Sequence, residues 1–486
     1  MNYSVIKRIV GWLLVFEAIF LLVPTLTAVV YGEWETLESI LSTLLLCLGL
    51  GGICMLGKPK STAIYAKEGM VIVALSWIIL SIFGALPFWL SREIPSYIDA
   101  LFETVSGFTT TGATIMPSGE AIEALPKSLL MWRSFTHWVG GMGVLVFIMA
   151  FLPLSGGRNM YIMKAESPGP IVGKLVPKVR QTAKILYGIY LGLTVIMVLM
   201  LLCGRMSFFE ALNTAFATAG TGGFSVKADG FAGYSHYLQW VVTVFMLLFS
   251  LNFNAYFLIL CGKIKDAFNL EIRVFLGIVF AAITLITINI CVTTSALYDY
   301  AVGDAIRYSA FSVASVISTT GFTTVNFDIW PALSKSILVL LMFIGACAGS
   351  TGGGIKVSRL VVLYKGATHE MKRALHPKQV KKISMDGRIV EHEVVRNTNA
   401  YLVIYLLIFI ASLFLVSLSC EDMVTNFTAV AATFNNIGPG LGKVGPAGNF
   451  AFYSDFSKLV FIFDMLAGRL ELFPMLILFR PATWKK

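Results

Sequence analysis

The sequence predicts an all-α polytopic membrane protein with ten transmembrane helices, and three observations support this prediction. Hydrophobic residues make up 57% of the 486 residues and charged residues only 13%, whereas soluble domains carry about 25% charged residues. Apolar runs of about 20 residues, the length that crosses a bilayer, recur along the whole chain. Shorter apolar segments, each ending in a glycine motif, recur between them.

The long apolar runs number ten. They lie near residues 9–30, 37–56, 69–90, 127–152, 185–203, 237–261, 274–297, 332–364, 400–419 and 456–479. The first run follows Lys7 and Arg8, as the apolar part of a signal peptide would. It extends to about Val30 without an A-x-A cleavage signal, so we expect it to be retained as the first span.

Four shorter apolar segments lie between the long ones. They cover residues 98–109, 207–218, 305–318 and 422–435. At 12 to 14 residues they are too short to cross a bilayer and fit re-entrant helices. Each leads into a glycine motif, namely TTTGAT at 109–114, AGTGGFS at 219–225, STTGFT at 318–323 and NNIGPG at 435–440. Gly112, Gly222, Gly321 and Gly438 are 110, 99 and 117 residues apart, which indicates an internal repeat.

A long span, a half-span, a glycine motif and a second long span form a unit that occurs four times after an initial helix pair. We expect four pseudo-symmetric helix–pore loop–helix repeats around one pore. The predicted units are an N-terminal two-helix unit at 1–66, pore repeats at 67–153, 182–263, 270–366 and 397–480, and a cytoplasmic basic loop at 367–396.

The lysines and arginines predict the orientation of the spans. Of 37 such residues, 27 fall in segments on one side of the predicted membrane and 8 on the other, while Arg133 and Arg469 lie within spans. Positive residues concentrate on the cytoplasmic side. We therefore expect both termini in the cytoplasm and all four glycine motifs on the outer side of a lipid-embedded chain.

Other classes of protein find little support. Seven dispersed cysteines without CxxC and five scattered histidines form neither a disulfide framework nor a metal site. The net charge of +10 follows the ends of the spans, so it does not indicate nucleic-acid binding. The sequence lacks a pair of catalytic carboxylates or a nucleophile motif, and we predict that the chain is not an enzyme. The segment 367–396 is either a solvated positive-inside loop or a docking surface for a cytosolic partner.

The glycine motifs predict a cation filter. Non-helical backbone is tolerated at membrane depth where it lines a watery passage, and rings of carbonyls replace the hydration shell of K⁺ in selective filters. The motifs contain no acidic residue, which disfavours a divalent-cation site. The alternative is that these glycines only allow close helix packing. The candidate potassium-binding residues are Thr111, Gly112, Thr221, Gly222, Thr320, Gly321, Ile437 and Gly438.

The first three glycine motifs, with RSFTHWVGGMG at 133–143 and GRLE at 468–471, resemble the Trk/Ktr/HKT superfamily of potassium transporters. The extra N-terminal helix pair is similar to the TrkH branch. The resemblance implies potassium uptake in a bacterial inner membrane, a homodimer with one pore per subunit, and a cytosolic TrkA-type ring. It places the regulatory nucleotide, NAD(H) or ATP/ADP, on that ring and not on this chain. The fourth motif departs from the pattern, because Ile437 and not threonine precedes its glycine.

The span from Pro331 to about Lys365 is too long for one straight crossing, and its middle contains the candidate gate residues. These are Gly349, Thr351, Gly352, Gly353 and Gly354. Three consecutive glycines should break a helix, since each costs up to about 1 kcal/mol relative to alanine. A phosphate loop is disfavoured because the Walker pattern needs Gly-Lys-Ser/Thr in succession. A helix-packing face formed by Gly349 and Gly353 stays possible, whereas the resemblance implies an intramembrane loop that obstructs the pore.

Three basic residues within predicted spans need an explanation, namely Arg469, Arg133 and His137. An isolated charge at Arg469 would be costly in a membrane, so we expect either a structural pair with Asp464, Glu471 or a helix end, or a pore-facing arginine that contacts the glycine loop and belongs to the gate. The resemblance favours the second. Arg133 and His137, one turn apart, are interpreted as packing or interfacial residues.

Together these observations predict potassium conduction through a carbonyl-lined filter, gated by the glycine loop and a cytosolic partner. The alternative is a K⁺/H⁺ or K⁺/Na⁺ coupled symporter.

Overall fold

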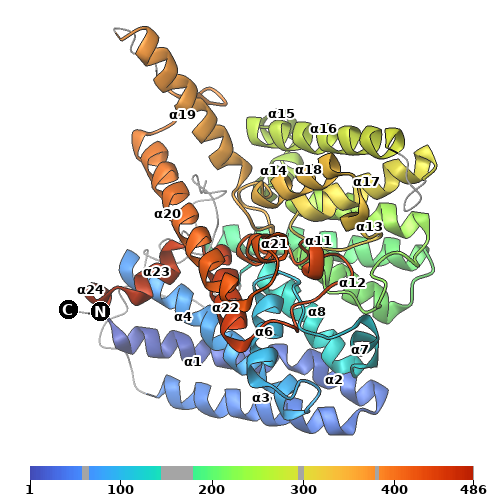
Figure 1. The fold of residues 1–486 in the computed structure, drawn as a ribbon. Coiled ribbons are helices and arrows are strands. Elements are labelled where there is room, and N and C mark those ends of the chain that lie inside the picture. The colour runs from blue at the N-terminus through green and yellow to red at the C-terminus, as the bar shows by residue number, and fades with distance from the viewer. Residues whose placement is uncertain (57–64, 144–178, 294–299, 378–381, 485–486) are drawn as a thin grey trace.

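The computed structural model describes residues 1–56, 65–143, 179–293, 300–377 and 382–484, and most of these residues lie in helices (Figure 1). The strands in this part of the chain, β1 (Ser384–Met385) and β2 (Arg388–Ile389), form one antiparallel hairpin. Side chains such as Leu26, Phe280 and Phe414 are 66%, 73% and 74% exposed. Exposure of this kind on long apolar helices confirms the predicted all-α polytopic membrane class.

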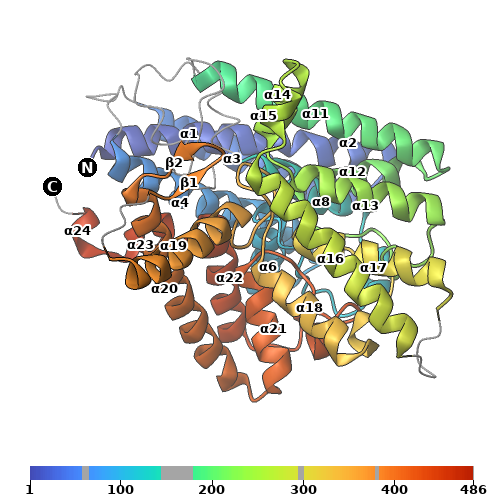
Figure 2. The same ribbon diagram turned by 90° about the horizontal axis from the view of Figure 1, so that it is seen from above.

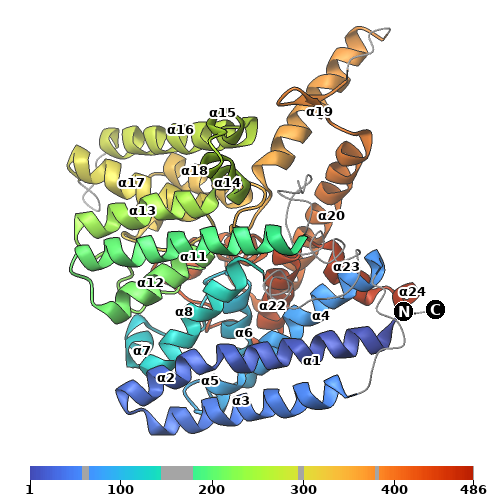
Figure 3. The same cartoon turned by 180° about the vertical axis from the view of Figure 1, so that it is seen from behind.

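The N-terminal unit is a helical hairpin. Helix α1 (Tyr3–Phe20) continues into α2 (Leu22–Tyr31), and Gly32 in a left-handed conformation turns the chain into α3 (Trp34–Met55). Figure 3 shows α1 and α3 side by side along one edge of the molecule. Gly11 and Gly51 allow this close approach, because a Cβ on Gly51 would lie 3.0 Å from the carbonyl oxygen of Gly11.

Each predicted half-span is a helix of 12 to 16 residues. These four half-helices are α6 (Tyr97–Phe108), α12 (Phe208–Gly220), α17 (Val302–Ile317) and α21 (Met423–Phe434). Side chains of Ser96, Ser207 and Asp422 accept N–H bonds at the starts of α6, α12 and α21, as N-cap residues do. In Figure 2, α6 lies near the middle of the view with α8, α18 and α22 around it.

A long helix precedes each half-helix and a shorter one follows it. The preceding helices are α4 (Ala66–Gly84) with α5 (Leu86–Leu90), α11 (Val179–Cys203), α16 (Leu270–Val292) and α20 (His392–Val416). The following helices are α8 (Lys127–Gly141), α13 (His236–Ser250), α18 (Ala332–Phe343) and α22 (Asp455–Arg469), of 15, 15, 12 and 15 residues. Short elements complete the described chain: α7 (Gly119–Ala124), α15 (Ile264–Ala267), α24 (Pro481–Trp484), η1 (Phe327–Ile329), η2 (Ser417–Ser419) and η3 (Gly442–Val444).

The predicted break in the third of these following spans is present, because α18 ends at Phe343 and α19 begins only at Val357. Two other following spans, which the sequence analysis treated as continuous, are broken as well. The chain bends by 92° between α13 and α14 (Phe253–Leu260). It also breaks between α22 and α23 (Phe473–Phe479), where Glu471 and Leu472 have positive φ. Helix α8 ends at Gly141, and residues 144–152 of that predicted span lie outside the described residues.

Because of these breaks, six helices in the described chain are long and apolar enough to cross a membrane, or seven if the α13–α14 pair is one span. The ten-span count and the repeat boundaries therefore stay predictions. The predicted basic loop at 367–396 is largely structured. It contains the end of α19 (Val357–Leu375), the β-hairpin and the start of α20, and α19 extends away from the body in Figure 1.

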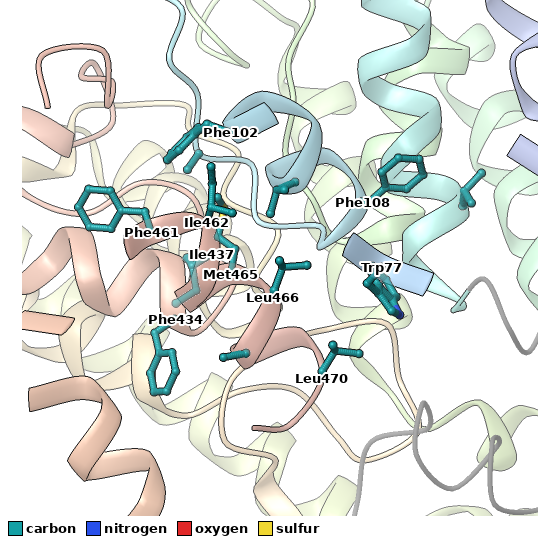
Figure 4. Close-up of a cluster of buried hydrophobic side chains, with 14 of the residues drawn as sticks. Trp77, Phe102, Phe108, Phe434, Ile437, Phe461, Ile462, Met465, Leu466 and Leu470 are labelled. Atoms are coloured by element: carbon teal, nitrogen blue, oxygen red, sulfur yellow. The ribbon is translucent and has the colours of Figure 1, made fainter. Parts of the chain in front are cut away.

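The hydrophobic core surrounds the ends of the half-helices. Figure 4 shows Phe108 at the end of α6 and Phe434 at the end of α21, together with Met465 and Leu466 of α22. These four side chains are at most 5% exposed. The turns that follow the half-helices are therefore held inside protein.

Candidate ion pathway

Each half-helix ends in the same backbone hydrogen-bond pattern. After α6 the N–H of Thr111 donates to the carbonyl of Ser106 at 2.9 Å, and the N–H of Thr110 donates to that of Gly107 at 3.1 Å. The equivalent first bond joins Gly222 to Ala217, Thr320 to Ser315 and Ile437 to Ala432, each at 2.9 Å. This is the Schellman termination, in which one residue after the helix adopts left-handed angles.

The left-handed residue in these turns is threonine or asparagine in place of the usual glycine. Thr110, Thr221, Thr319 and Asn436 have φ of 57°, 57°, 59° and 56°. Threonine rarely takes this conformation, which costs roughly 1–3 kcal/mol per residue. The same strained position occurs in four turns, so the surrounding structure must impose it in each.

The glycine that follows two residues later also has positive φ, and it defines the register of the turns. Gly112, Gly223, Gly321 and Gly438 have φ of 79°, 75°, 82° and 99°. The structural equivalent of Gly112 is therefore Gly223, one residue later than the Gly222 that the sequence pattern aligned with it. Gly222 corresponds to Thr111, Thr320 and Ile437, because backbone conformation and not the Thr-Gly dipeptide decides the register.

These glycines bring the four turns into a closed ring. A Cβ on Gly112 would meet the carbonyl oxygen of Gly222, and one on Gly223 would meet that of Thr320. A Cβ on Gly321 would meet the carbonyl of Ile437, and one on Gly438 that of Thr111. All four approaches are under 3.0 Å, closer than a side chain allows. Only glycine lets each turn contact the next carbonyl, and the fourth turn returns to the first.

A cavity of about 140 Å³ opens on the ring, and residues of all four turns line it, including Gly112, Gly223, Gly321 and Gly438. Arg133 and Lys227 also contribute to its lining, and the described residues that line it include no carboxylate. Within the described chain, no group of three or more His, Cys, Asp or Glu residues is placed to hold a metal ion. The ring thus offers backbone carbonyl oxygens as its donor set.

The glycine-rich loop between α18 and α19 lies against this ring. The N–H of Gly353 donates to Thr319 Oγ1 at 2.7 Å, and a Cβ on Gly353 would lie 2.5 Å from the carbonyl oxygen of Asn435. Gly349 and Gly354 have φ of 74° and 67°. The loop therefore contacts the third and fourth turns directly and needs glycine to take its path.

Other elements hold the first half of this loop. The N–H of Cys347 donates to the carbonyl of Ser250 at 3.1 Å, and Thr351 Oγ1 donates to that of Phe249 at 3.1 Å. Both acceptors lie at the end of α13, beside its bend. Thr351 is fully buried.

Arg469 contacts the loop from the end of α22. Its Nη1 donates to the carbonyl of Thr351 at 2.8 Å, while Nη2 donates to the carbonyls of Gly140 and Gly141 at the end of α8. Two expected partners bond elsewhere, since Asp464 accepts from Ser412 at 2.6 Å and Glu471 pairs with Arg359. Arg469 thus joins the loop to α8 and α22, the helices that follow the first and fourth half-helices.

Comparison with known proteins places the chain in a family. The model of the TrkH family, described as a cation transport protein, matches residues 38–486. The chain belongs to the TrkH family. It is 35% identical over its full length to the full length of the Trk system potassium uptake protein TrkH of Escherichia coli K12, and 31% identical to TrkG of the same organism over 100% of this chain and 99% of TrkG.

A solved structure agrees with this assignment. The crystal structure of the potassium transporter TrkH from Vibrio parahaemolyticus superposes with a TM-score of 0.88 at 32% identity, covering all of both chains. The resemblance to the TrkH branch is therefore confirmed. The named relatives are transport proteins, which also confirms the prediction that the chain is not an enzyme.

In this TrkH-family chain, His137 and Arg133 are both buried, at 0% and 2% exposed. His137 Nδ1 lies 2.7 Å from the carbonyl oxygen of Gly107, and its Nε2 lies 3.3 Å from the N–H nitrogen of Phe224. A carbonyl only accepts, so Nδ1 bears the proton and Nε2 accepts from Phe224. Both residues are packed inside the protein, as expected. The His137 side chain also joins the first half-helix to the second turn.

Arg133 forms a buried ion pair that the sequence analysis missed. Its Nε lies 2.6 Å from Oε1 of Glu103 on α6, and its guanidinium stacks 3.8 Å from the ring centroid of Phe224. Glu103 also accepts from Thr114 Oγ1 and from the N–H of Ile115. A carboxylate in the middle of an apolar half-span is the signal that could have identified this partner.

Two charged residues that hold the glycine loop were also missed. Glu271 at the start of α16 accepts from the N–H of Ala348 at 2.7 Å and from that of Ser358 at 3.1 Å. Lys356 Nζ donates to the carbonyls of Gly352 and Gly353. A carboxylate thus joins both ends of the loop, while an ammonium group binds carbonyls at its centre.

Proposed function

We propose that this chain conducts K⁺ across a bacterial inner membrane and supports potassium uptake. The observation that carries the proposal is the closed ring, in which equivalent carbonyls of four turns approach equivalent glycines. Carbonyl rings replace the hydration shell of K⁺. The C-terminal ends of four half-helices meet at this ring, and their partial negative charge favours a cation.

The filter in this proposal comprises the four residue pairs that build the ring. Thr111 with Gly112, Gly222 with Gly223, Thr320 with Gly321 and Ile437 with Gly438 supply the contacts. Thr221 belongs to the set as the strained residue of the second turn. The related proteins named as potassium uptake proteins support K⁺ as the transported ion.

The gate in this proposal is the loop that contains Gly349, Thr351 and Gly352 to Gly354, together with Arg469. Its contacts with Thr319 and Asn435 support a location directly beside the filter turns. Opening would require the loop to leave these contacts and Arg469 to release the Thr351 carbonyl.

We further propose the surroundings in which this pore operates. The chain forms a homodimer with one pore per subunit, both termini face the cytoplasm, and a TrkA-type ring that binds NAD(H) or ATP/ADP regulates the gate. The positive-inside distribution of lysine and arginine supports the orientation. The family's Trk system relatives support a partner.

The test is rubidium tracer uptake into liposomes that contain the purified protein and a high internal concentration of K⁺. A conducting pore predicts uptake that follows the K⁺ gradient and is unaffected when an H⁺ or Na⁺ gradient is added. Uptake that requires either gradient would indicate that the chain is a coupled symporter and not a pore. Absence of rubidium uptake under all three conditions, with the TrkA-type partner present, would remove the proposal.

A further inference from the structure

The second turn of the ring lacks a side chain where the other three have one. At the position whose carbonyl contacts the neighbouring glycine, the residues are Thr111, Gly222, Thr320 and Ile437. In the first and third turns a hydroxyl at this position bonds within its own turn, because Thr111 Oγ1 lies 2.8 Å from Thr109 Oγ1 and Thr320 Oγ1 lies 2.6 Å from Ser318 Oγ. In the fourth turn, Ile437 is fully buried in the core shown in Figure 4.

The space that a side chain on Gly222 would fill is occupied by the ring of His137. A Cβ built on Gly222 would lie under 3.0 Å from the Nδ1, Cγ and Cε1 atoms of this imidazole. A Cβ on Gly220 would meet the backbone carbonyl of His137 equally closely. The glycines of the second motif are thus matched to one residue of α8.

The imidazole also bonds the second turn to the first repeat. It accepts from the N–H of Phe224 and donates to the carbonyl of Gly107, and the rings of His137 and Phe224 lie 4.2 Å apart. Gly107 is a residue of α6 that lies two positions before Thr109. One side chain therefore fixes the second turn relative to the half-helix that supports its neighbour in the ring.

We propose that His137 is a positioning residue for ion selectivity, which supplies from α8 the side chain that the second turn lacks. It acts by fixing the Gly222 carbonyl, and it does not itself touch the ion. This inference rests on the proposed filter. It explains why the second motif reads Gly-Gly where the first and third read Thr-Gly, since the imidazole and a threonine cannot share the site.

The test replaces the His137 imidazole beside residue 222 with a threonine side chain on residue 222 itself. Gly222→Thr alone places a side chain against the imidazole, and His137→Gly alone leaves a void with an unsatisfied N–H and carbonyl. Each should lower the ratio of rubidium to sodium transport at least ten-fold. The double variant gives the second turn a Thr-Gly pair and room for it, while the bonds of the imidazole to Phe224 and Gly107 stay lost. The ratio should therefore rise above that of either single variant without reaching wild type. Substitutions at two residues in contact have non-additive effects. If the losses of the two single variants simply add in the double variant, the proposal is overturned.

Two single variants test the same idea without the exchange. Glutamine reaches about as far as Nε2 and can accept from Phe224, whereas asparagine reaches only the Nδ1 position. His137→Gln should keep most of the selectivity and His137→Asn should lose it. Equal selectivity in the two variants would contradict the proposal, provided that both elute as monodisperse proteins with similar unfolding temperatures.

Two controls separate this inference from the filter itself. Gly277→Thr, on α16 with nothing within 4 Å of its added Cβ, should leave the transport ratio unchanged. Gly223→Ala places a Cβ against the Thr320 carbonyl of the ring, and the three atoms nearest to that Cβ belong to the third turn. This variant should lower the ratio. If Gly223→Ala has no effect, the filter assignment fails. If it has the expected effect while the exchange shows no recovery, only the role of His137 fails.

Discussion

Asn436 Nδ2 donates a hydrogen bond to Thr111 Oγ1 at 2.9 Å, across 325 residues of chain. The same nitrogen also donates to the carbonyl of Met465 at 2.9 Å. The fourth motif lacks a threonine hydroxyl, but its asparagine amide binds the hydroxyl of the first motif. The ring of turns is therefore closed by a side-chain bond as well as by backbone contact.

Thr111→Val tests this closure. Valine keeps the shape of threonine but removes the bonds to Thr109 and Asn436, and a buried donor without a partner costs about 1–3 kcal/mol. We expect a lower unfolding temperature and a lower ratio of rubidium to sodium uptake. Thr284→Val is the control, because Thr284 bonds only its own helix carbonyl at an exposed position. Equal ratios in the two variants would exclude a role for the closing bond.

Gly321→Ser tests the backbone of the third turn. The position has φ of 82°, and a Cβ there would lie under 3.0 Å from the carbonyl oxygen of Ile437, so the backbone of the turn must move to admit a side chain. We expect weaker discrimination against sodium and at least ten-fold less rubidium uptake in a strain deficient in potassium uptake. Gly277→Ser is the matched control. Unchanged rubidium uptake with unchanged sodium exclusion would show that this turn is not part of the filter.

Arg469→Ala tests the hold on the glycine loop. The change removes bonds to the carbonyls of Thr351, Gly140 and Gly141, and bonds from a charged group contribute about 1.5–3 kcal/mol each. Loss of even one shifts a closed–open equilibrium by about ten-fold or more. We therefore expect a higher basal rubidium flux into liposomes without the cytosolic partner, and an intermediate flux for Arg469→Lys. A basal flux equal to wild type in both variants would contradict the gate role.

The centre of the loop offers a second test of the gate. Deletion of Gly352 to Gly354 shortens the segment that contacts Thr319 and Asn435. Lys356→Met keeps the length of the side chain but removes the ammonium group that binds the Gly352 and Gly353 carbonyls. We expect higher basal flux from both variants with the rubidium-to-sodium ratio preserved, measured in the same liposomes. A basal flux equal to wild type in both variants would show that the loop does not obstruct the path.

Glu271→Ala tests how both ends of the loop are held. The carboxylate accepts from the N–H groups of Ala348 and Ser358, so its removal should cost about 1.5–3 kcal/mol per lost bond. We expect a lower unfolding temperature together with raised basal flux. Glu271→Gln keeps an acceptor oxygen and should lie between alanine and wild type. If the alanine variant lowers stability without altering flux, Glu271 supports the fold alone.

The sequence by itself determined the membrane class, the approximate places of the long helices and all four half-helices. Hydropathy and run length are local properties, so the segment at 98–109 matches α6 (Tyr97–Phe108) closely. The glycine motifs were equally visible. Their spacing was enough to suggest that four turns meet, because re-entrant segments of one repeat type can surround a single axis.

The tertiary structure alone decided the register of the second turn, the breaks after α13 and α22, and the contacts of His137. These depend on contacts between residues far apart in sequence, which hydropathy does not encode. The Thr221-Gly222-Gly223 sequence allows two alignments with the other motifs, and only the positive φ of Gly223 selects between them. The imidazole of His137 sits where the side chain of residue 222 would be, and only packing between α8 and the second turn could show that.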